Sequence, residues 1–345
     1  PFFQAVSGIR DWSVTGVQKC ALPIFNRVLE TGMIPKDWLI GIVIPIFKKK
    51  GSEKDANNYR DITLLSCLGK LFTCILNNRL YHFSEENNIV KENQAAFRKA
   101  YSTLDHIFLL KGLIDMYFSN SKKMYCYFID YEKAFPSVWR TGLWLKLLGY
   151  GVDGKFFRVV YNMYKDIKSC VCVNNEYSDY FVSYSGVRQG ENLSPLLFAM
   201  FVNDLEECIW QKGISPIELS EADLGCYIKL SVIMYADDTV LISDSSEGLQ
   251  NGLDALYDYC QDWNLKVNES KTKVMIFCKR VTKDMKLLQF TLNKTKVDIV
   301  KSYKYLGVLF TPNGRFKETI KYLCDQAQKA MVCLLKTSKV TEITN

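Results

Sequence analysis

The spacing of apolar positions divides the chain into alternating strands and helices. Runs rich in β-branched and aromatic residues predict strands at residues 40–47, 59–65, 124–129 and 273–278. Apolar residues that recur every three to four positions predict helices at 66–80, 102–118, 141–166, 194–209 and 249–260, with a hairpin at 168–183. Residues 124–280 therefore show the order strand, helix, hairpin, helix, strand.

Two adjacent acidic residues interrupt this pattern within an apolar, β-branched run. Asp237 and Asp238 lie between strand-like segments at 228–234 and 239–243, so they are predicted to form the turn of a hairpin. Buried carboxylates need a cationic partner, and hard oxygen ligands suit Mg²⁺. The alternative is an ordinary surface turn, in which Asp is common.

A second acidic position follows the apolar strand at 124–129. Asp130 stands directly at its carboxyl end, where sheet proteins often place chemistry. The alternative is that Asp130 only caps the following helical turn, which begins near Glu132 and Lys133.

Composition and charge limit the class of protein. A chain of 345 residues predicts two or three lobes, and 48% hydrophobic with 23% charged residues is typical of globular proteins, with no apolar run long enough to span a bilayer. The net charge of +7 is clustered, most densely at Lys48-Lys49-Lys50, which fits a polyanionic substrate unless the run is a solvated face. The 12 cysteines show no pairing interval and are expected to be reduced.

Five motifs occur in a fixed order. They are Phe-Ile-Asp-Tyr-Glu-Lys-Ala-Phe at 128–135, Gly-Val-Arg-Gln-Gly at 186–190 with Leu-Ser-Pro-Leu-Leu-Phe at 193–198, Tyr-Ala-Asp-Asp at 235–238, Asn-Glu-Ser-Lys-Thr-Lys at 268–273, and Tyr-Leu-Gly at 305–307. In this order they resemble the reverse transcriptases of non-LTR (LINE-type) retrotransposons. The resemblance extends from about residue 33 to about residue 320.

The resemblance implies an α+β fold of the right-hand polymerase type. Fingers are expected at 26–123, a ferredoxin-like palm with the catalytic carboxylates at 124–290, and the primer grip with the start of a truncated thumb at 291–345. Residues 1–25 are expected to be a non-native or disordered leader, because they show neither helix nor strand periodicity and residues 7–18 resemble translated sequencing-adapter read-through.

The resemblance also implies a two-metal mechanism, with Mg²⁺ as the cofactor and Mn²⁺ as a substitute. Two ions roughly 3.5–4 Å apart need carboxylates from different parts of the chain. Asp130, Asp237, Asp238 and the backbone oxygen of Tyr131 are the expected metal ligands, with Asp238 ranked second because neighbouring side chains alternate along a strand. Lys271 is the expected group that protonates or neutralises pyrophosphate; the alternative is a surface lysine.

Further residues follow from the same resemblance. Lys48, Lys49 and Arg60 are expected to bind the triphosphate, and Gln189 and Gly190 to line the nucleotide pocket. Phe135 is expected to press on the sugar and exclude a 2′-hydroxyl, although without its motif it would be read as a core residue. Template and primer contacts are expected at Gln94, Phe97, Arg98, Tyr305, Leu306 and Gly307.

The function implied is that of an RNA-directed DNA polymerase acting on an RNA template, a DNA primer and dNTPs. No membrane partner is expected, and an endonuclease domain is expected elsewhere in the full product. A nuclear location is expected only because members of the family copy RNA at a nicked chromosomal site. Three alternatives stay open: an RNA-copying RNA polymerase, a group II intron-type maturase, and an inactive RNA-binding remnant. Phe135 and the Tyr-Ala-Asp-Asp form favour the reverse transcriptase.

Overall fold

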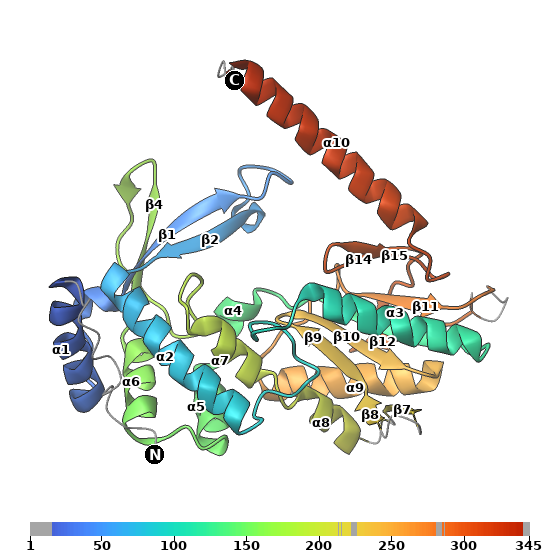
Figure 1. The fold of residues 1–345 in the computed structure, drawn as a ribbon, viewed down its shortest axis with the longest axis horizontal. Helices are drawn as coiled ribbons and strands as arrows, with labels where there is room; N and C mark the ends of the chain where they lie inside the picture. The colour runs from blue at the N-terminus through green and yellow to red at the C-terminus, as the bar shows by residue number, and fades with distance from the viewer. Residues whose placement is uncertain are drawn as a thin grey trace. The chain divides into compact units, whose positions relative to one another are not determined.

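The computed structural model describes residues 16–340 apart from 213, 215, 222–225, 281–284 and 286. These residues form two compact units (Figure 1). The first unit contains residues up to 91 together with 133–203 and 263–265, and the second contains 92–132, 204–262 and the residues from 266 onward. Each unit is therefore assembled from three separate stretches of chain.

The first unit contains a five-stranded sheet. Its strands are β1 (Ile40–Phe47), β2 (Tyr59–Leu64), β4 (Lys168–Val173), β5 (Glu176–Tyr177) and β6 (Phe181–Val182). The order is β2-β1-β4-β5, with β6 also paired to β4; β1 and β4 are parallel and the other pairs antiparallel. The predicted hairpins at 40–65 and 168–183 thus join in one sheet.

The helices of the first unit contribute many of its buried apolar side chains. They are α1 (Gly16–Thr31), α2 (Cys67–Glu86), α4 (Ala134–Ser137), α5 (Arg140–Gly149), α6 (Gly154–Lys165) and α7 (Ser194–Phe201), with short 3₁₀ turns at Lys36–Trp38 and Ala56–Asn58. The single helix predicted at 141–166 is two helices, because the chain turns at Gly151, which has φ +79°.

The expectation of an unpacked leader up to residue 25 is wrong for its last part. Helix α1 begins at Gly16, and its residues Ala21 and Phe25 are buried. The ring of Phe25 lies 5.9 Å from that of Trp38 and 5.3 Å from that of Phe72. Residues 1–15 lie outside the described part of the chain.

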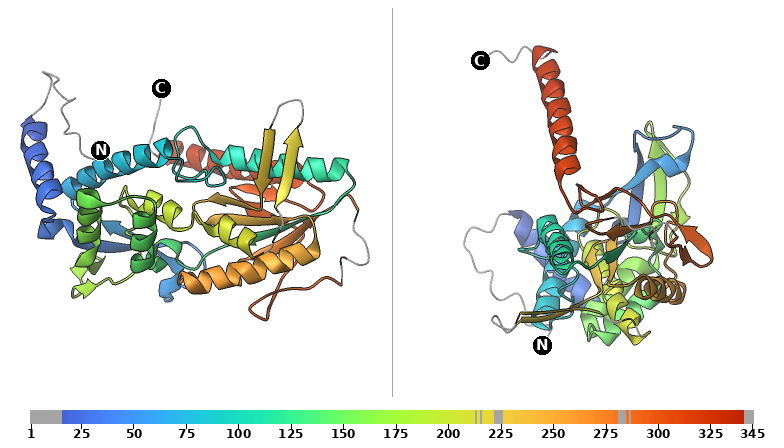
Figure 2. Two further views of the ribbon diagram at one scale, coloured as in Figure 1. Left: turned by 90° about the horizontal axis from the view of Figure 1, so that it is seen from below. Right: turned by 90° about the vertical axis from the view of Figure 1, so that its right-hand side faces the viewer.

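The second unit is organised around a four-stranded antiparallel sheet. Its order is β11 (Lys273–Phe277), β3 (Met124–Ile129), β10 (Asp238–Ser243), β9 (Val232–Tyr235). Helix α3 (Thr103–Ser119) covers one face and helix α9 (Ser246–Asp262) the other, as Figures 1 and 2 show. Because both faces are covered, all six residues of β3 are buried.

Two further helices and three hairpins complete the described part of the second unit. They are α8 (Leu205–Gln211), α10 (Lys317–Val340) and the hairpins β7 (Ile217–Glu221) with β8 (Cys226–Leu230), β12 (Phe290–Leu292) with β13 (Thr295–Val297), and β14 (Tyr303–Tyr305) with β15 (Val308–Phe310). The strand predicted at 228–234 is divided at Ser231, whose N–H donates to Glu206 at 2.8 Å. In the part of the chain that is described, no helix is long and apolar enough to cross a membrane.

Candidate active site

The turn between β9 and β10 presents the two adjacent aspartates at one edge of the second unit's sheet. Strand β9 ends at Tyr235 and β10 begins at Asp238, which pairs with Tyr235, so Ala236 and Asp237 form a two-residue connection. Ala236 has φ +58°, the left-handed conformation that tight hairpin turns require. The predicted hairpin is therefore confirmed.

Gln94 holds this turn in place. Its side-chain oxygen accepts hydrogen bonds from the N–H groups of Ala236 (3.0 Å) and Ala96 (3.1 Å), and its Nε2 lies 3.5 Å from the oxygen of Ala236. The residue is fully buried. The buried Gln94 thus supports the β9–β10 turn from within, and its expected contact with a template stays a prediction.

Asp130 lies at the same edge of the sheet. The last pair between β3 and β10 is Ile129 with Thr239, so Asp130 and Asp238 follow on neighbouring strands. The backbone N–H of Asp130 donates to the buried Thr272 hydroxyl at 3.2 Å, and its carbonyl accepts from the N–H of Asn268 at 2.7 Å. The register thus brings Asp130 beside Asp238, a carboxylate 108 positions away in the sequence (238 − 130 = 108).

Asp237 and Asp238 both have raised pKa values. Burial raises the pKa of Asp237, and the nearby charge of Asp130 raises it further, although a backbone hydrogen bond and Lys271 oppose the shift. Burial, followed by the charges of Asp237 and Asp130, raises the pKa of Asp238 to about 6. In the described contacts, these three carboxylates outnumber the cations beside them, so the edge carries a net negative charge.

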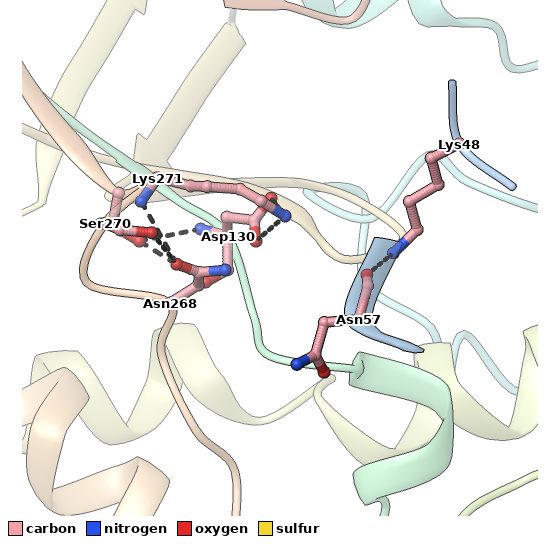
Figure 3. Close-up of polar contacts among 7 residues, drawn as sticks. Lys48, Asn57, Asp130, Asn268, Ser270 and Lys271 are labelled. Atoms are coloured by element: carbon pink, nitrogen blue, oxygen red, sulfur yellow. Dashed lines mark hydrogen bonds and ion pairs between the residues drawn. The ribbon is translucent and has the colours of Figure 1, made fainter. Parts of the chain in front are cut away.

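Among the described residues, Lys271 is a cation that contacts this edge (Figure 3). Its Nζ lies 3.1 and 3.4 Å from the two carboxylate oxygens of Asp130. Its loop is fixed by Asn268, whose side-chain oxygen accepts from the Ser270 hydroxyl at 2.8 Å and the Lys271 N–H at 3.3 Å. The motif at 268–273 thus packs directly on the motif at 128–135, as a shared site requires.

The donor set fits a divalent cation. Asp130, Asp237 and Asp238 offer hard carboxylate oxygens, which Mg²⁺ prefers. The raised pKa values of Asp237 and Asp238 reflect a charge that a metal ion would stabilise. Within the described residues, no three His, Cys, Asp or Glu side chains are already arranged around a common metal position. The neighbouring Tyr131 is buried and forms an isolated antiparallel β-bridge with Val267. That its backbone oxygen binds a metal ion stays a prediction.

The hairpin β14–β15 contributes a tyrosine that the sequence analysis missed. The ring of Tyr303 stacks on Phe128 with centroids 4.3 Å apart, and burial, followed by the charges of Asp130 and Asp238, raises the pKa of Tyr303 to about 12. Tyr305 is buried, while Leu306 and Gly307 form the turn with φ +45° and +86°. Alternation along the strand could have singled out Tyr303, two positions before Tyr305.

The other predicted template residues lie before helix α3. Phe97 has φ +64° and is 45% exposed. The Arg98 guanidinium lies 3.2 Å from the Glu92 carboxylate and 4.4 Å from the centre of the Tyr101 ring, and its side chain is largely buried. Phe97 is thus the more accessible of the two to a nucleic acid.

The predicted nucleotide pocket residues belong to the first unit. Phe135 stacks on Phe198 of α7 with centroids 5.0 Å apart, and its carbonyl accepts from the N–H of Val187 at 2.9 Å. Gly186 has φ +81°, and a Cβ there would lie 2.5 Å from the carbonyl oxygen of Pro136. The motifs at 128–135 and 186–190 are thus joined at Phe135.

Two arginines that the sequence analysis did not single out hold the 186–190 loop. Arg140 donates to the carbonyls of Gly186 (2.9 Å) and Ser185 (3.0 Å), and also to those of Ser183 and Tyr164. The buried Arg188 donates to the carbonyls of Trp38 (2.7 Å) and Met163 (3.2 Å). The loop is consequently tied to the sheet and helices behind it.

The basic residues lie on the β1–β2 hairpin of the first unit. Arg60 is exposed on β2, and Lys48 donates to the carbonyl of Asn57 at 2.9 Å, while Lys49 has φ +54°. Gly190, predicted beside the nucleotide with Gln189, has φ +101°, and a Cβ there would lie 3.0 Å from the carbonyl of Thr63 on β2. Contact of Lys48, Lys49 and Arg60 with a triphosphate stays a prediction.

Comparisons with known proteins show the family of the chain. The family described as "Reverse transcriptase (RNA-dependent DNA polymerase)" matches residues 47–310, which is more than half of the chain. The chain belongs to this family. Its motifs were assigned to the non-LTR reverse transcriptases, and that assignment is confirmed by the relatives below.

The curated relatives of this reverse transcriptase chain come from mobile elements. A probable RNA-directed DNA polymerase from transposon BS of Drosophila melanogaster is 31% identical over 86% of this chain and 32% of its own length. The RNA-directed DNA polymerase from mobile element jockey is 27% identical over 83% and 30%. A Pol polyprotein from the retrotransposable element R2 of Nasonia vitripennis is 24% identical over 92% and 30%. The chain spans about a third of the length of these relatives.

Solved structures of telomerase support the fold. Apo telomerase from Candida tropicalis superposes with a TM-score of 0.53 at 12% identity, over 86% of this chain and 52% of that chain. A form truncated from the C-terminal domain gives 0.52 over 81% and 54%. The predicted class, an α+β fold of the right-hand polymerase type, is confirmed.

Proposed function

We propose that this chain is the polymerase domain of a non-LTR retrotransposon product and that it copies RNA into DNA. The observation that carries the proposal is the edge where Asp130, Asp237 and Asp238 meet. Three separate motifs supply that edge: the end of β3, the β9–β10 turn and the Asn268–Lys271 loop.

The position of each residue at this edge suggests its role in nucleotidyl transfer. Two Mg²⁺ ions, or Mn²⁺ in their place, would stabilise the attacking and leaving oxygens of nucleotidyl transfer when bound. Asp130, Asp237 and Asp238 would hold them, with the backbone oxygen of Tyr131. Lys271 already lies against Asp130 and would neutralise or protonate the pyrophosphate once that carboxylate engages a metal.

Nucleotide selection would rest on the first unit. Lys48, Lys49 and Arg60 would meet the triphosphate, Arg60 with two parallel hydrogen bonds and the lysines as point charges. The stack on Phe198 holds the ring of Phe135 in place. A ring held in this way would exclude a 2′-hydroxyl by steric clash. Gly190 would let the backbone approach the nucleotide closely.

The partners of the whole product follow from the proposal. They are an RNA template, a DNA primer and dNTPs, and the fuller product would add an endonuclease domain and act in the nucleus. The names of the relatives, which describe RNA-directed DNA polymerases of mobile elements, support the template and the product.

Primer extension tests the proposal. The chain should extend a DNA primer on an RNA template with dNTPs and Mg²⁺, and Asp237→Asn should abolish extension while still binding the template. Phe135→Ala should incorporate ribonucleotides more readily than the parent. A parent that extends no better than Asp237→Asn but binds RNA would be an inactive remnant, and a parent that uses only ribonucleotides would be an RNA polymerase.

A further inference from the structure

Strand β9 stands at the end of the second unit's four-stranded sheet, with β10 on one side of it. In an antiparallel pair, the N–H groups of alternate residues point away from the partner strand. Along β9 and its turn these are the N–H groups of Val232, Met234 and Ala236, which are all buried. Each of them therefore needs an acceptor from outside the sheet.

The segment that carries Gln94 supplies the acceptors nearest the turn. The N–H of Met234 donates to the carbonyl oxygen of Asn93 at 2.7 Å, and the carbonyl oxygen of Met234 accepts from the N–H of Ala95 at 3.1 Å. Gln94 thus forms a parallel β-bridge with Met234, and its side-chain oxygen reaches the N–H of Ala236. The position of this segment along β9 therefore sets where the residue before the turn's first aspartate is held.

A buried carboxylate on helix α8 ties the start of β9 to this segment. Oε1 of Glu206 accepts hydrogen bonds from the N–H groups of Ser231 (2.8 Å) and Val232 (3.1 Å). Its Oε2 accepts from the side-chain Nδ2 of Asn93 at 2.8 Å. Glu206 is 5% exposed and Asn93 is 6% exposed. Hydrogen bonds made in such a water-poor place are stronger than those at the surface, so this contact fixes the separation of the two segments.

The orientation of the Asn93 amide follows from its partner. An ionised carboxylate only accepts hydrogen bonds, so Asn93 must present its NH₂ group to Glu206. The Oδ1 of Asn93 is then buried without a hydrogen-bond partner among the described residues. A buried acceptor without a partner costs stability, and such local conflicts are expected where a chain serves function.

We propose that Glu206 is a positioning residue for the β9–β10 turn. It would act through Asn93, which sets the position of Gln94 beside β9. Groups that hold a metal must stay within about 0.5 Å of the productive geometry, so a small slip of this segment would matter. The effect on catalysis rests on the proposed function, whereas the effect on the backbone of β9 does not.

Exchanging the donor and the acceptor tests the contact. Glu206→Leu removes all three hydrogen bonds. Glu206→Gln keeps an oxygen for β9 and offers an NH₂ group to Asn93, whose unpaired Oδ1 can turn to accept it. Asn93→Asp sets two carboxylates against each other, and adding Glu206→Gln to it restores a donor and an acceptor.

Tyr259→Phe is the matched control for lost stability. It removes a buried hydroxyl that donates to Asp204 at 2.7 Å, just before α8, and leaves the contact of Glu206 with Asn93 in place. Three measurements are made on the full chain. They are hydrogen exchange of the amides at 232–236 without substrate or metal, single-turnover primer extension across Mg²⁺ concentrations, and binding of the RNA template.

In Glu206→Leu, the amides at 232–236 should exchange about tenfold faster or more, and extension should slow about tenfold with more Mg²⁺ needed. Its affinity for the template should stay at the parental value. Asn93→Asp should behave in the same way, whereas Glu206→Gln should stay close to the parent. The double variant should recover most of what Asn93→Asp loses. Tyr259→Phe should show parental exchange at 232–236 and a parental Mg²⁺ requirement.

Parental exchange in Glu206→Leu would overturn the proposal, and so would a parental Mg²⁺ requirement in that variant of an active chain. A double variant no better than Asn93→Asp, or a Tyr259→Phe variant that reproduces the losses, would also overturn it. If Glu206→Leu fails to fold, Asn93→Asp and the double variant carry the same test. If the parent extends no primer, the proposed function fails, whereas faster exchange confined to the variants that break the contact would still support the positioning of β9.

Discussion

The two main sheets of the molecule differ in how deeply the side chains of their strands are buried. In the second unit, α3 and α9 cover both faces, and every residue of β3 is buried. In the first unit, β2 has four of its six residues exposed.

This difference matches what each sheet has to supply. Carboxylates that share a metal must be held within a narrow range of distances, and a sheet packed on both faces fixes the register that places them. Arg60, which is proposed to meet the triphosphate, lies on the exposed β2 and has to be accessible to its ligand. The covered sheet thus suits the proposed chemistry, and the exposed strand suits the proposed binding.

The largest effect is expected when a carboxylate is removed from the edge of the covered sheet. Asp130→Asn should lower primer extension on the order of a thousandfold or more, because it removes a ligand whose effect is needed in the transition state. Single-turnover rates measured across Mg²⁺ concentrations would check this. Glu132→Gln, at an exposed carboxylate two positions on, is the matched control and should keep the parental rate.

The next effect concerns the support of the catalytic turn. Gln94→Leu keeps the buried volume but removes the hydrogen bonds to Ala236, so the rate should fall roughly 10- to 100-fold, with more Mg²⁺ needed for half-maximal activity. Gln250→Leu is the control, since Gln250 bonds the backbone of Thr291 away from the site. An unchanged Mg²⁺ requirement in Gln94→Leu would show that the turn holds its shape without this side chain.

A third change tests the loop of the first unit. Gly190→Ala adds a Cβ at φ +101° and 3.0 Å from the Thr63 carbonyl, so the KM for dNTP should rise roughly tenfold with a smaller change in kcat. Gly149→Ala has open space around its Cβ and should leave both constants unchanged. Equal kinetics in the two variants would remove Gly190 from the nucleotide pocket.

The smallest expected effect is on stability. Folding raises the pKa of Asp238 from 3.8 to about 6, so the folded state takes up a proton between these values and stability falls as the pH rises from about 4 to about 6. Because this side chain is partly open to water, Asp238→Asn should gain only about 1 kcal/mol at pH 7.5 without metal. Urea unfolding at pH 7.5 and pH 4 would check this.

The gain should be largely lost at pH 4, where the parental carboxyl is protonated in the folded state and partly protonated in the unfolded state. Activity should follow the opposite course, falling as the pH drops below about 6, because the protonated carboxyl is a poor metal ligand. A stabilisation that persisted at pH 4 would point to packing and not to charge.

The carboxylates could be predicted from the sequence because they stand at the ends of strongly patterned strands. Asp130 ends an apolar run and Asp237 interrupts one, so the position of each follows from local pattern. The support of Gln94 could not be predicted, because it depends on a contact across 142 positions. The same holds for Arg140, whose partners lie more than 20 residues away.

The missed part of α1 has a simpler cause. Its buried residues Ala21, Phe25, Val28 and Leu29 follow helical spacing, but half of them lie after residue 25. A window that stopped at residue 25 therefore divided the pattern and hid it.

The way in which the chain passes between its units has a consequence for synthesis. Trp263 belongs to the first unit, where its ring lies 3.6 Å from the ammonium of the buried Lys146 and packs against Phe201 and Trp139. The amino-terminal unit therefore stays incomplete until residue 263 has left the ribosome, by which point much of the second unit has also been made. Emerging segments must wait for partners far downstream, so the two units are expected to mature late and nearly together, with apolar surfaces open to chaperones until then.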